Sequence, residues 1–181
     1  MSPPTSSPLY VVAYAACVSA AFTAAVMTVH VATAERVRLN DQLFEQRALL
    51  ELFAGPLGLR ADPRDTDPAD VDRLVARRFD RTLVVTDPRT GRAFRLVRAY
   101  GPDLGTGAPL LGYAVPFEGQ GFWNTIRGLL AFQADGQTVL GIAFLDQKET
   151  PGLGGRIAEP WYRRRFEGLR LAPPPDGDPF L

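Results

Sequence analysis

An uncharged N-terminal stretch constrains the fold of this chain more than any other feature. Residues 9–34 read LYVVAYAACVSAAFTAAVMTVHVATA, and no charged residue occurs before Glu35. A helix of this length, rising about 1.5 Å per residue, can cross a hydrocarbon core of roughly 30 Å. Tyr10 and Tyr14 suit the membrane interface, and the recurring alanines allow another helix to approach closely. We therefore expect a short tail at residues 1–8 and one transmembrane helix over residues 9–34.

A secretory signal peptide is the alternative, because Ala32-Thr33-Ala34 resembles a cleavage site. The apolar run is longer than the usual signal core of about 7–15 residues, and no Lys or Arg precedes it, so we favour an uncleaved anchor. Arg36, Arg38 and Arg47 follow the span, and the positive-inside rule alone would place the C-terminal part in the cytoplasm. His30 is expected at the helix end as an interfacial residue rather than as a metal ligand.

The composition excludes several kinds of chemistry. Lys+Arg and Asp+Glu number 20 each, so no basic surplus points to nucleic acid. Cys17 is the single cysteine, which excludes an internal disulfide and a multi-cysteine metal site. Residues 35–181 contain no histidine, and no serine follows Ser19, so a Ser-His-Asp arrangement cannot form there. We expect no metal site, and any redox or group-transfer chemistry would need a bound cofactor.

The remainder of the chain begins with helical patterns. Apolar residues recur at close to helical spacing after Arg36, which indicates that the first helix continues or that a helix restarts there, and "GPLG" at 55–58 ends it. Asp67 followed by Pro68 is typical of an N-cap with proline in the first turn of a helix. That short helix would have an apolar face formed by Val71, Leu74, Val75 and Phe79.

After Asp80 the pattern becomes that of strands. Five runs rich in β-branched and aromatic residues are separated by turn signals, at 82–86, 92–100, 110–117, 126–134 and 138–145. Asp135-Gly136 predicts a tight type I′ hairpin, with positive φ at both central residues. A short helix is expected at 159–166 and a proline-rich tail at 173–181. The fold class is α+β: one transmembrane helix, then an antiparallel-sheet domain at residues 35–172 with flanking helices.

Residues 146–157, DQKETPGLGGRI, follow the last predicted strand and crowd glycines around a proline. A surface turn is the simplest interpretation; a loop that brings backbone close to a ligand is the other. The segment lacks the GxGxxG spacing of dinucleotide folds and the lysine of a P-loop.

The surrounding residues 119–168 resemble a known family. They contain Gly-x-Gly-aromatic-Trp at 119–123, then Gly-Leu-Leu-Ala, Asp-Gly, Gly-Ile-Ala-Phe and Glu-Thr-Pro-Gly-Leu-Gly at 149–154. This pattern resembles the FMN-binding domain shared by the C subunit of the Na+-translocating NADH:quinone reductase and the G subunit of the Rnf electron-transfer complex. Gly155, the Pro160-Trp161 pair and the segment QRALLELFAGPLG at 46–58 are more similar to the C subunit.

The resemblance implies an electron-transfer subunit that relays single electrons through FMN within a membrane complex. Its partners would be the other membrane subunits, and its soluble domain would lie outside the cytoplasm on the inner or cytoplasmic membrane, against the charge bias of the arginines. The implied cofactor-binding residues are Trp123, Glu149, Thr150, Pro151, Gly152, Leu153, Gly154 and Gly155.

The implied roles of these residues follow from their chemistry. The three glycines remove Cβ atoms where a ring or phosphate would approach, Thr150 can donate a hydrogen bond, and Pro151 fixes the entry direction. Trp123 would pack against the ring or would be a core aromatic residue. Glu149 would accept hydrogen bonds from loop amides or repel reduced flavin.

The chain departs from the family in one respect. Family members attach FMN to the last threonine of a Ser/Thr-Gly-Ala-Thr motif, and this sequence does not contain that motif. The nearest match, Thr106-Gly107-Ala108-Pro109, has proline in place of the acceptor. We therefore expect non-covalent FMN, in a shortened family member or in a site that another polypeptide completes. Alternatives are a non-redox anchored accessory subunit that has lost the flavin, and an anchored or secreted binding module.

Overall fold

A computed structural model describes residues 8–86, 88, 90–101, 104 and 107–171. The tails expected at residues 1–8 and 173–181 lie outside this range, except for Pro8, which begins the first helix. The chain divides into two compact units, Met1–Gln42 and Leu43–Leu181.

A single helix, α1 (Pro8–Leu52), accounts for the described part of the first unit and continues into the second. Its 45 residues confirm the long apolar N-terminal helix, and of the two alternatives after Arg36 the helix continues rather than restarts. By length and composition this helix can cross a membrane, a property that a signal sequence near the N-terminus would share. Large apolar side chains such as Phe22 and Val26 are exposed along it.

The end of α1 differs from the prediction that "GPLG" stops the helix. α1 ends at Leu52, and residues Ala54–Leu57 form a separate short helix, α2, that includes the glycine and the proline. Gly58 terminates α2 in the left-handed region with φ of 65°. The proline lies in the first turn of α2, where a missing N–H costs no helical hydrogen bond.

The next helix, α3 (Pro68–Arg78), begins as the sequence predicts. The Ala69 N–H donates to Oδ1 of Asp67 at 2.9 Å, and Pro68 occupies the first turn. Val71 and Val75 are buried on the inner face of α3.

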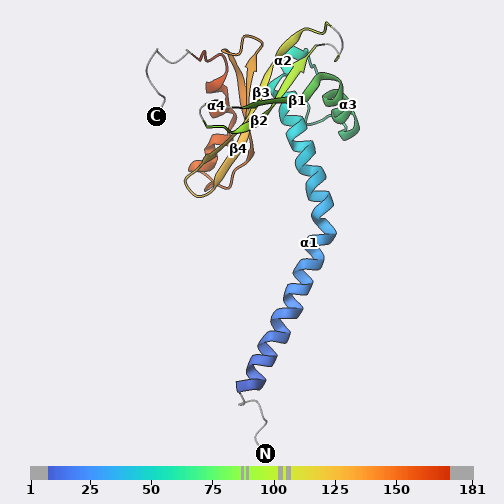
Figure 1. The fold of residues 1–181 in the computed structure, drawn as a ribbon, viewed down its shortest axis with the longest axis vertical. Helices are drawn as coiled ribbons and strands as arrows, with labels where there is room; N and C mark the ends of the chain where they lie inside the picture. Colours follow the sequence, from blue (N-terminus) through green and yellow to red (C-terminus); the bar gives the residue numbers. More distant parts are fainter. Residues whose placement is uncertain (1–7, 87, 89, 102–103, 105–106, 172–181) are drawn as a thin grey trace, which may run out of the picture. The chain divides into compact units, whose positions relative to one another are not determined.

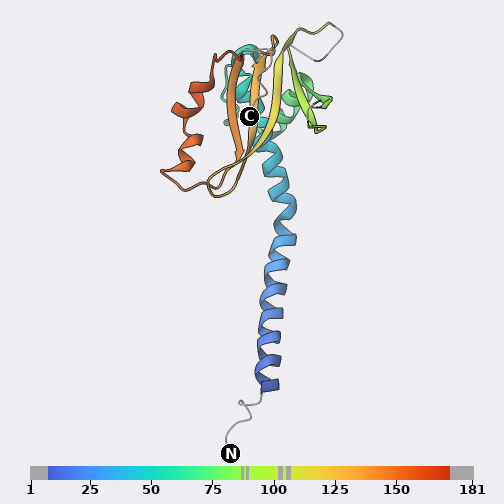
Figure 2. The ribbon, with the colours of Figure 1, turned by 60° about the vertical axis from the view of Figure 1, so that its left-hand side comes forward.

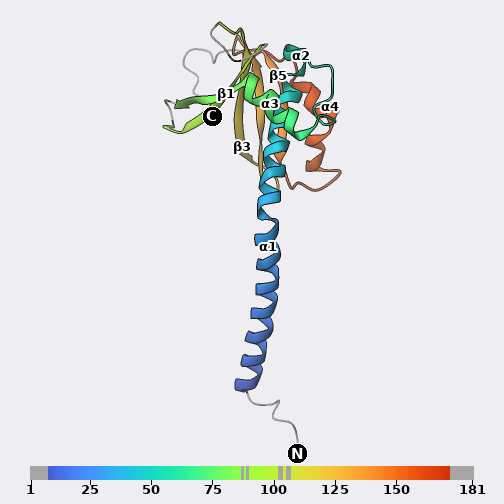
Figure 3. The same cartoon turned by 90° about the vertical axis from the view of Figure 1, so that its right-hand side faces the viewer.

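Five antiparallel strands form one sheet whose spatial order is the order of the sequence, β1-β2-β3-β4-β5. The strands are β1 (Phe79–Thr86), β2 (Ala93–Tyr100), β3 (Leu110–Gln120), β4 (Thr125–Gln133) and β5 (Val139–Asp146). Figure 1 shows this meander, with colours running from green at β1 to orange at β5. The C-terminal end of β1 and the start of β2 project away from β3 in Figure 3. The predicted α+β class is confirmed.

The β4–β5 hairpin forms where predicted, but the predicted turn type is wrong. Gly136 has φ of 68°, whereas Asp135 does not have positive φ, so the pair is not a type I′ turn. The Asp135 carboxylate instead accepts hydrogen bonds from the N–H groups of Gln137 and Thr138 and from the Thr138 hydroxyl, at 2.7–2.9 Å. These bonds organise a longer turn around the aspartate side chain.

The second unit has a hydrophobic core that connects its helices to its sheet. Leu49, Leu50 and Phe53, from the end of α1 and just after it, are almost completely buried in one cluster with the helix α3 and the sheet. The sheet contributes both small side chains, such as Ala99 and Ala131, and large ones, such as Phe79 and Leu129, to this cluster.

Three short helical segments follow β5: η1 (Gly154–Ala158), α4 (Pro160–Arg163) and η2 (Arg164–Phe166). They confirm the predicted short helix with Pro160 in its first turn. Figure 2 shows α4, in red, beside β5, in orange, and residues of α4 and η2 contact β5.

Candidate functional site

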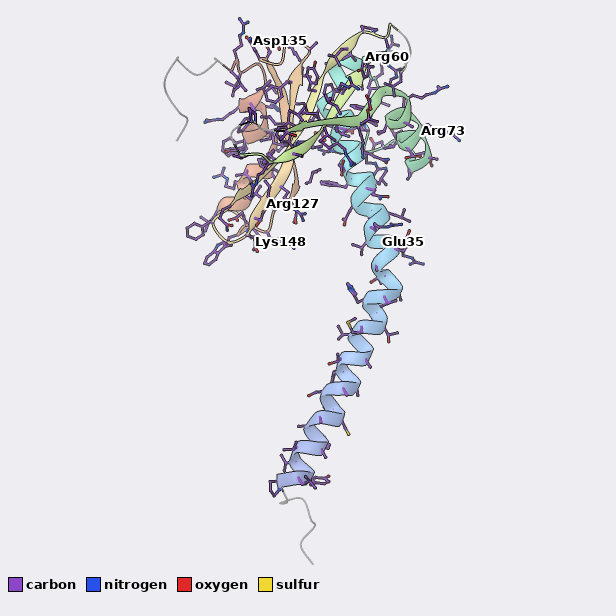
Figure 4. The ribbon with its side chains drawn as sticks, viewed as in Figure 1. Glu35, Arg60, Arg73, Arg127, Asp135 and Lys148 are labelled. Atoms are coloured by element: carbon purple, nitrogen blue, oxygen red, sulfur yellow. The ribbon has the colours of Figure 1, made fainter. Side chains whose placement is uncertain are left out.

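Two loops lie together at one end of the sheet. The first, residues 121–124, connects β3 to β4, and the second, residues 147–153, follows β5. The start of β4 pairs with the ends of both neighbouring strands, through Gln120 with Thr125 and Arg127 with Asp146. Both loops therefore leave the sheet at the same end of its strands. Figure 4 shows Arg127 and Lys148 at this end of the domain, opposite to Asp135.

Glu149 connects the two loops. In the described part of the chain it is the one charged residue among the buried residues, with 7% of its surface exposed. Its Oε1 accepts the backbone N–H of Trp123 at 3.1 Å and that of Asn124 at 3.2 Å. A buried carboxylate is stable only when such donors replace water. The sequence left two roles open for this residue, and the geometry supports the acceptor of loop amides.

Two glycines make room for the Glu149 side chain. A Cβ atom at Gly121 would overlap Oε1 of Glu149, and a Cβ atom at Gly154 would lie 2.8 Å from Oε2 and 3.0 Å from Cβ of Glu149. Real Cβ atoms do not approach other atoms so closely. At Gly154, it is therefore the side chain of Glu149 that leaves no room for a Cβ atom.

The Thr-Pro-Gly-Leu segment forms a tight turn. The carbonyl of Thr150 accepts the N–H of Leu153 at 3.1 Å and that of Gly155 at 3.1 Å, and Gly152 has φ of 78°. Proline at the second position and a positive-φ glycine at the third are the features of a type II turn. The positive φ of the turn requires glycine at position 152. No neighbouring atom requires it, since a Cβ atom there would meet nothing within 4 Å.

Exposed apolar side chains cluster on these two loops. Phe122 is 82% exposed, Trp123 is 64% exposed and Leu153 is 74% exposed. The rings of Phe122 and Trp123 meet edge to face, with centroids 5.0 Å apart. Trp123 is therefore not a core aromatic residue, which was one of its two predicted roles. Three large apolar side chains facing solvent at one site provide the surface that a flat aromatic ligand needs.

Charged groups flank the loops. Arg127 and Asp146 form an ion pair at 2.8 Å, and the hydrogen bond from Arg127 lowers the pKa of the Asp146 carboxyl. Lys148 is exposed. Arg127 and Asp146 offset each other, which leaves the charge of Lys148 at this end of the sheet.

Seven of the predicted site residues are consecutive in the sequence, 149–155, and the structure places Trp123 beside them through the bond from its N–H to Glu149. Thr150 and Pro151 are exposed. Gly155 is half-buried, and a Cβ atom there would lie 3.3 Å from the carbonyl oxygens of Glu149 and Thr150.

Sequence reasoning missed Gly121, Phe122 and Asn124 as members of the site. The Gly-x-Gly-aromatic-Trp motif at 119–123 contained the first two. The motif did not indicate that this loop meets Glu149, because that contact exists only after β3, β4 and β5 have paired.

Comparisons with known proteins define the class of this domain. Residues 121–176 match the family model of the FMN-binding domain. This match covers both loops and the turn, so this part of the chain belongs to the FMN-binding domain family.

Relatives of the chain include C subunits of the Na(+)-translocating NADH-quinone reductase. The Yersinia pestis protein is 32% identical over 143 residues, which cover 71% of this chain and 54% of that protein. The Pasteurella multocida protein is 47% identical over 57 residues, covering 32% of this chain and 22% of that protein. The chain thus spans about half, or less, of the length of these relatives.

A solved structure is also similar. The crystal structure of Shewanella oneidensis NqrC matches with a TM-score of 0.40 and 22% sequence identity, covering 61% of this chain and 52% of that chain.

Proposed function

We propose that this chain binds FMN at the two loops joined by Glu149 and acts as an electron-transfer subunit similar to the C subunit of the reductase. The observation that carries the proposal is the group of exposed apolar side chains Phe122, Trp123 and Leu153 beside the glycine-rich turn. Water-exposed aromatic residues on neighbouring loops of an FMN-binding domain are best explained by a flat ligand that covers them.

The residues present fit such a ligand. Trp123 and Phe122 would contact the ring system, and the exposed Thr150 would donate a hydrogen bond from its hydroxyl group. Glu149 would act indirectly, because its carboxylate holds the backbone from which Trp123 extends. Bound FMN would supply one-electron redox chemistry. The protein would fix the position of the ring and limit its contact with water.

These 181 residues contain no Ser/Thr-Gly-Ala-Thr sequence, and we propose on this ground that FMN bound by them is held without a covalent bond. We further propose that α1 is an uncleaved anchor and that the partners are the other membrane subunits of a Na+-translocating NADH:quinone reductase or a related complex. The soluble domain would lie outside the cytoplasm on the inner or cytoplasmic membrane.

A second function has a specific observation in its favour. Gly121, Gly152 and Gly154 are each explained by the protein's own turn or by Glu149, and not by a ligand. The loop can therefore be retained for folding alone, as in an anchored accessory subunit that has lost the flavin.

The absorption spectrum of the purified full chain, followed by acid precipitation, separates these functions. Flavin absorbance that moves entirely into the acid supernatant is expected, with the intact mass of the denatured chain unchanged. A flavin-sized mass increment on the denatured chain would contradict non-covalent binding. The complete absence of flavin, after incubation with FMN, would support the accessory function. Trp123→Ala should weaken FMN binding, whereas the exposed Trp161→Ala should not.

A further inference from the structure

A cavity that shares no residue with the two loops lies between the end of α1 and α4. Its volume is about 400 Å³, which is within the range of small-molecule sites. Its apolar lining includes Phe44, Ala143, Phe144 and Ala158.

The charges around this cavity do not balance. Three arginines and one glutamate line it, Arg47, Arg64, Arg163 and Glu51. The Glu51 carboxylate is shared by two of the arginines, Arg64 at 3.0 Å and Arg163 at 3.0 Å. The cavity therefore carries a surplus of two positive charges beside an apolar wall.

Of the three arginines that line the cavity, Arg47 is the one that forms no ion pair with a described carboxylate. Its Nη2 donates to the carbonyl oxygen of Thr66 at 2.9 Å, and no ion pair joins it to another described residue. The Nε–H groups of Arg47 and Arg163 are covered and find no acceptor within the described part of the chain. A half-buried guanidinium with unused donors is costly unless an anion compensates it.

A neighbouring cavity of about 330 Å³ shares Glu51, Arg64, Ala143 and Arg163 with the first. Arg164 adds a third cation there, but Asp62 and Glu167 add two more carboxylates. This second cavity is therefore balanced in charge. An anionic group would prefer the side of the first cavity, next to Arg47.

We propose that the first cavity binds an amphipathic anion, with a phosphate or carboxylate group held by Arg47 and its neighbours and an apolar body against Phe44 and Phe144. Arginine forms paired hydrogen bonds with both kinds of oxyanion. The same chemistry is offered by the headgroup of an anionic lipid and by a soluble aromatic or aliphatic phosphate. The site is separate from the proposed flavin function and does not depend on it.

Isothermal titration calorimetry on the full chain in a non-ionic detergent tests the site with three probes. These probes are inorganic phosphate, phenyl phosphate and dihexanoyl phosphatidic acid. Both amphipathic phosphates should bind, and inorganic phosphate should bind at least about tenfold more weakly, because it cannot use the apolar wall. Tighter binding of phosphatidic acid supports a lipid as the source, and tighter binding of phenyl phosphate supports a soluble anion.

Two variants and one control make the test specific. Arg47→Gln should weaken binding of the amphipathic phosphates about 10- to 100-fold. Ala158→Trp, a change at an exposed position, should block the cavity and have a similar effect if Arg47→Gln fails to fold. Arg73→Gln removes the same charge from an exposed position outside the cavity and should leave binding unchanged. Absence of binding, equal affinity for inorganic phosphate, or unchanged affinity in both cavity variants would overturn the proposal.

Discussion

Glu149 holds two loops in place with one carboxylate, and its removal should therefore destabilise the domain. Glu149→Ala would leave the N–H groups of Trp123 and Asn124 without their acceptor. We expect a loss of about 1–3 kcal/mol in the free energy of unfolding, the usual cost of buried donors left unpaired. Chemical denaturation of the full chain measures it. Glu149→Gln, which keeps an acceptor oxygen, should lose less.

The exposed Glu167 provides the control for this experiment. Glu167→Ala should change the free energy of unfolding by no more than about 0.5 kcal/mol, as is usual for surface positions. If Glu149→Ala were as harmless as this control, the carboxylate would not be the connection between the loops.

Gly154 should tolerate no side chain. In Gly154→Ala the new methyl group would lie 2.8 Å from Oε2 of Glu149, so the carboxylate would have to move from its two N–H donors. Overpacking of this kind costs about 1–3 kcal/mol. Gly119→Ala is the matched control, because a Cβ atom there meets nothing within 4 Å. If both substitutions lowered the unfolding temperature equally, then strand or backbone propensity, and not Glu149, would determine the loss of stability.

At the scale of single elements, the β4–β5 turn should make stability depend on pH. Hydrogen bonds from the backbone N–H and hydroxyl of Thr138 and from the N–H of Gln137 lower the pKa of Asp135 from 3.8 to about 2. The unfolded chain therefore takes up the proton more readily, and the contribution of Asp135 is lost as the pH falls from about 4 to about 2.

Asp135→Asn should remove this part of the acid sensitivity. The unfolding temperature of the variant should fall less than that of the parent chain between about pH 4 and about pH 2, and the variant should already be less stable at neutral pH. Asp65→Asn, at an exposed carboxylate that accepts no side-chain hydrogen bond from the described residues, should follow the parent curve. Parallel curves for Asp135→Asn and the parent would contradict the assigned role.

Local patterns in the sequence predicted most of the elements. The five strands, the Asp67 N-cap and the short helix at Pro160 depend on residues that are adjacent or a few positions apart, and they formed as expected. The type I′ turn was wrong because side-chain hydrogen bonds from residues 137 and 138 to Asp135 favour a different turn. Propensity rules for two central residues do not contain those bonds.

The candidate site was predicted less completely for a related reason. The glycine-rich loop was visible in the sequence, but its connection to Trp123 spans 26 residues and depends on how β3, β4 and β5 pair. Gly154 was expected to make room for a ligand. In the structure φ of Gly154 is not positive, and the atoms nearest to an added Cβ belong to Glu149. Only the folded arrangement reveals that neighbour.

At the scale of the whole molecule, the membrane topology decides on which side of the membrane the domain lies. We expect α1 to remain uncleaved and the domain to lie outside the cytoplasm, although the arginines after the apolar run favour the opposite direction. A chain with Cys17→Ala and Arg73→Cys carries one cysteine, at a side chain that is 76% exposed in the parent. A membrane-impermeant maleimide should label it in intact cells, after permeabilising any outer membrane.

Labelling that requires lysis of the cells would place the domain in the cytoplasm. Loss of the N-terminal residues from the purified chain, measured by intact mass, would show that the apolar segment is a signal peptide. The same maleimide reaction on Cys17→Ala alone should give no signal and serves as the control.

The order of the strands in the sheet has a consequence for how the domain is made. Each strand pairs with the one that precedes it in the chain, and the buried residues at the end of α1 come before all five. Connections between successive strands are short, so closing them costs little entropy, and local contacts favour rapid folding. Ribosomes deliver the N-terminal part of a chain first. The sheet can therefore assemble hairpin by hairpin on a helix that is already present, in the order in which the chain is translated.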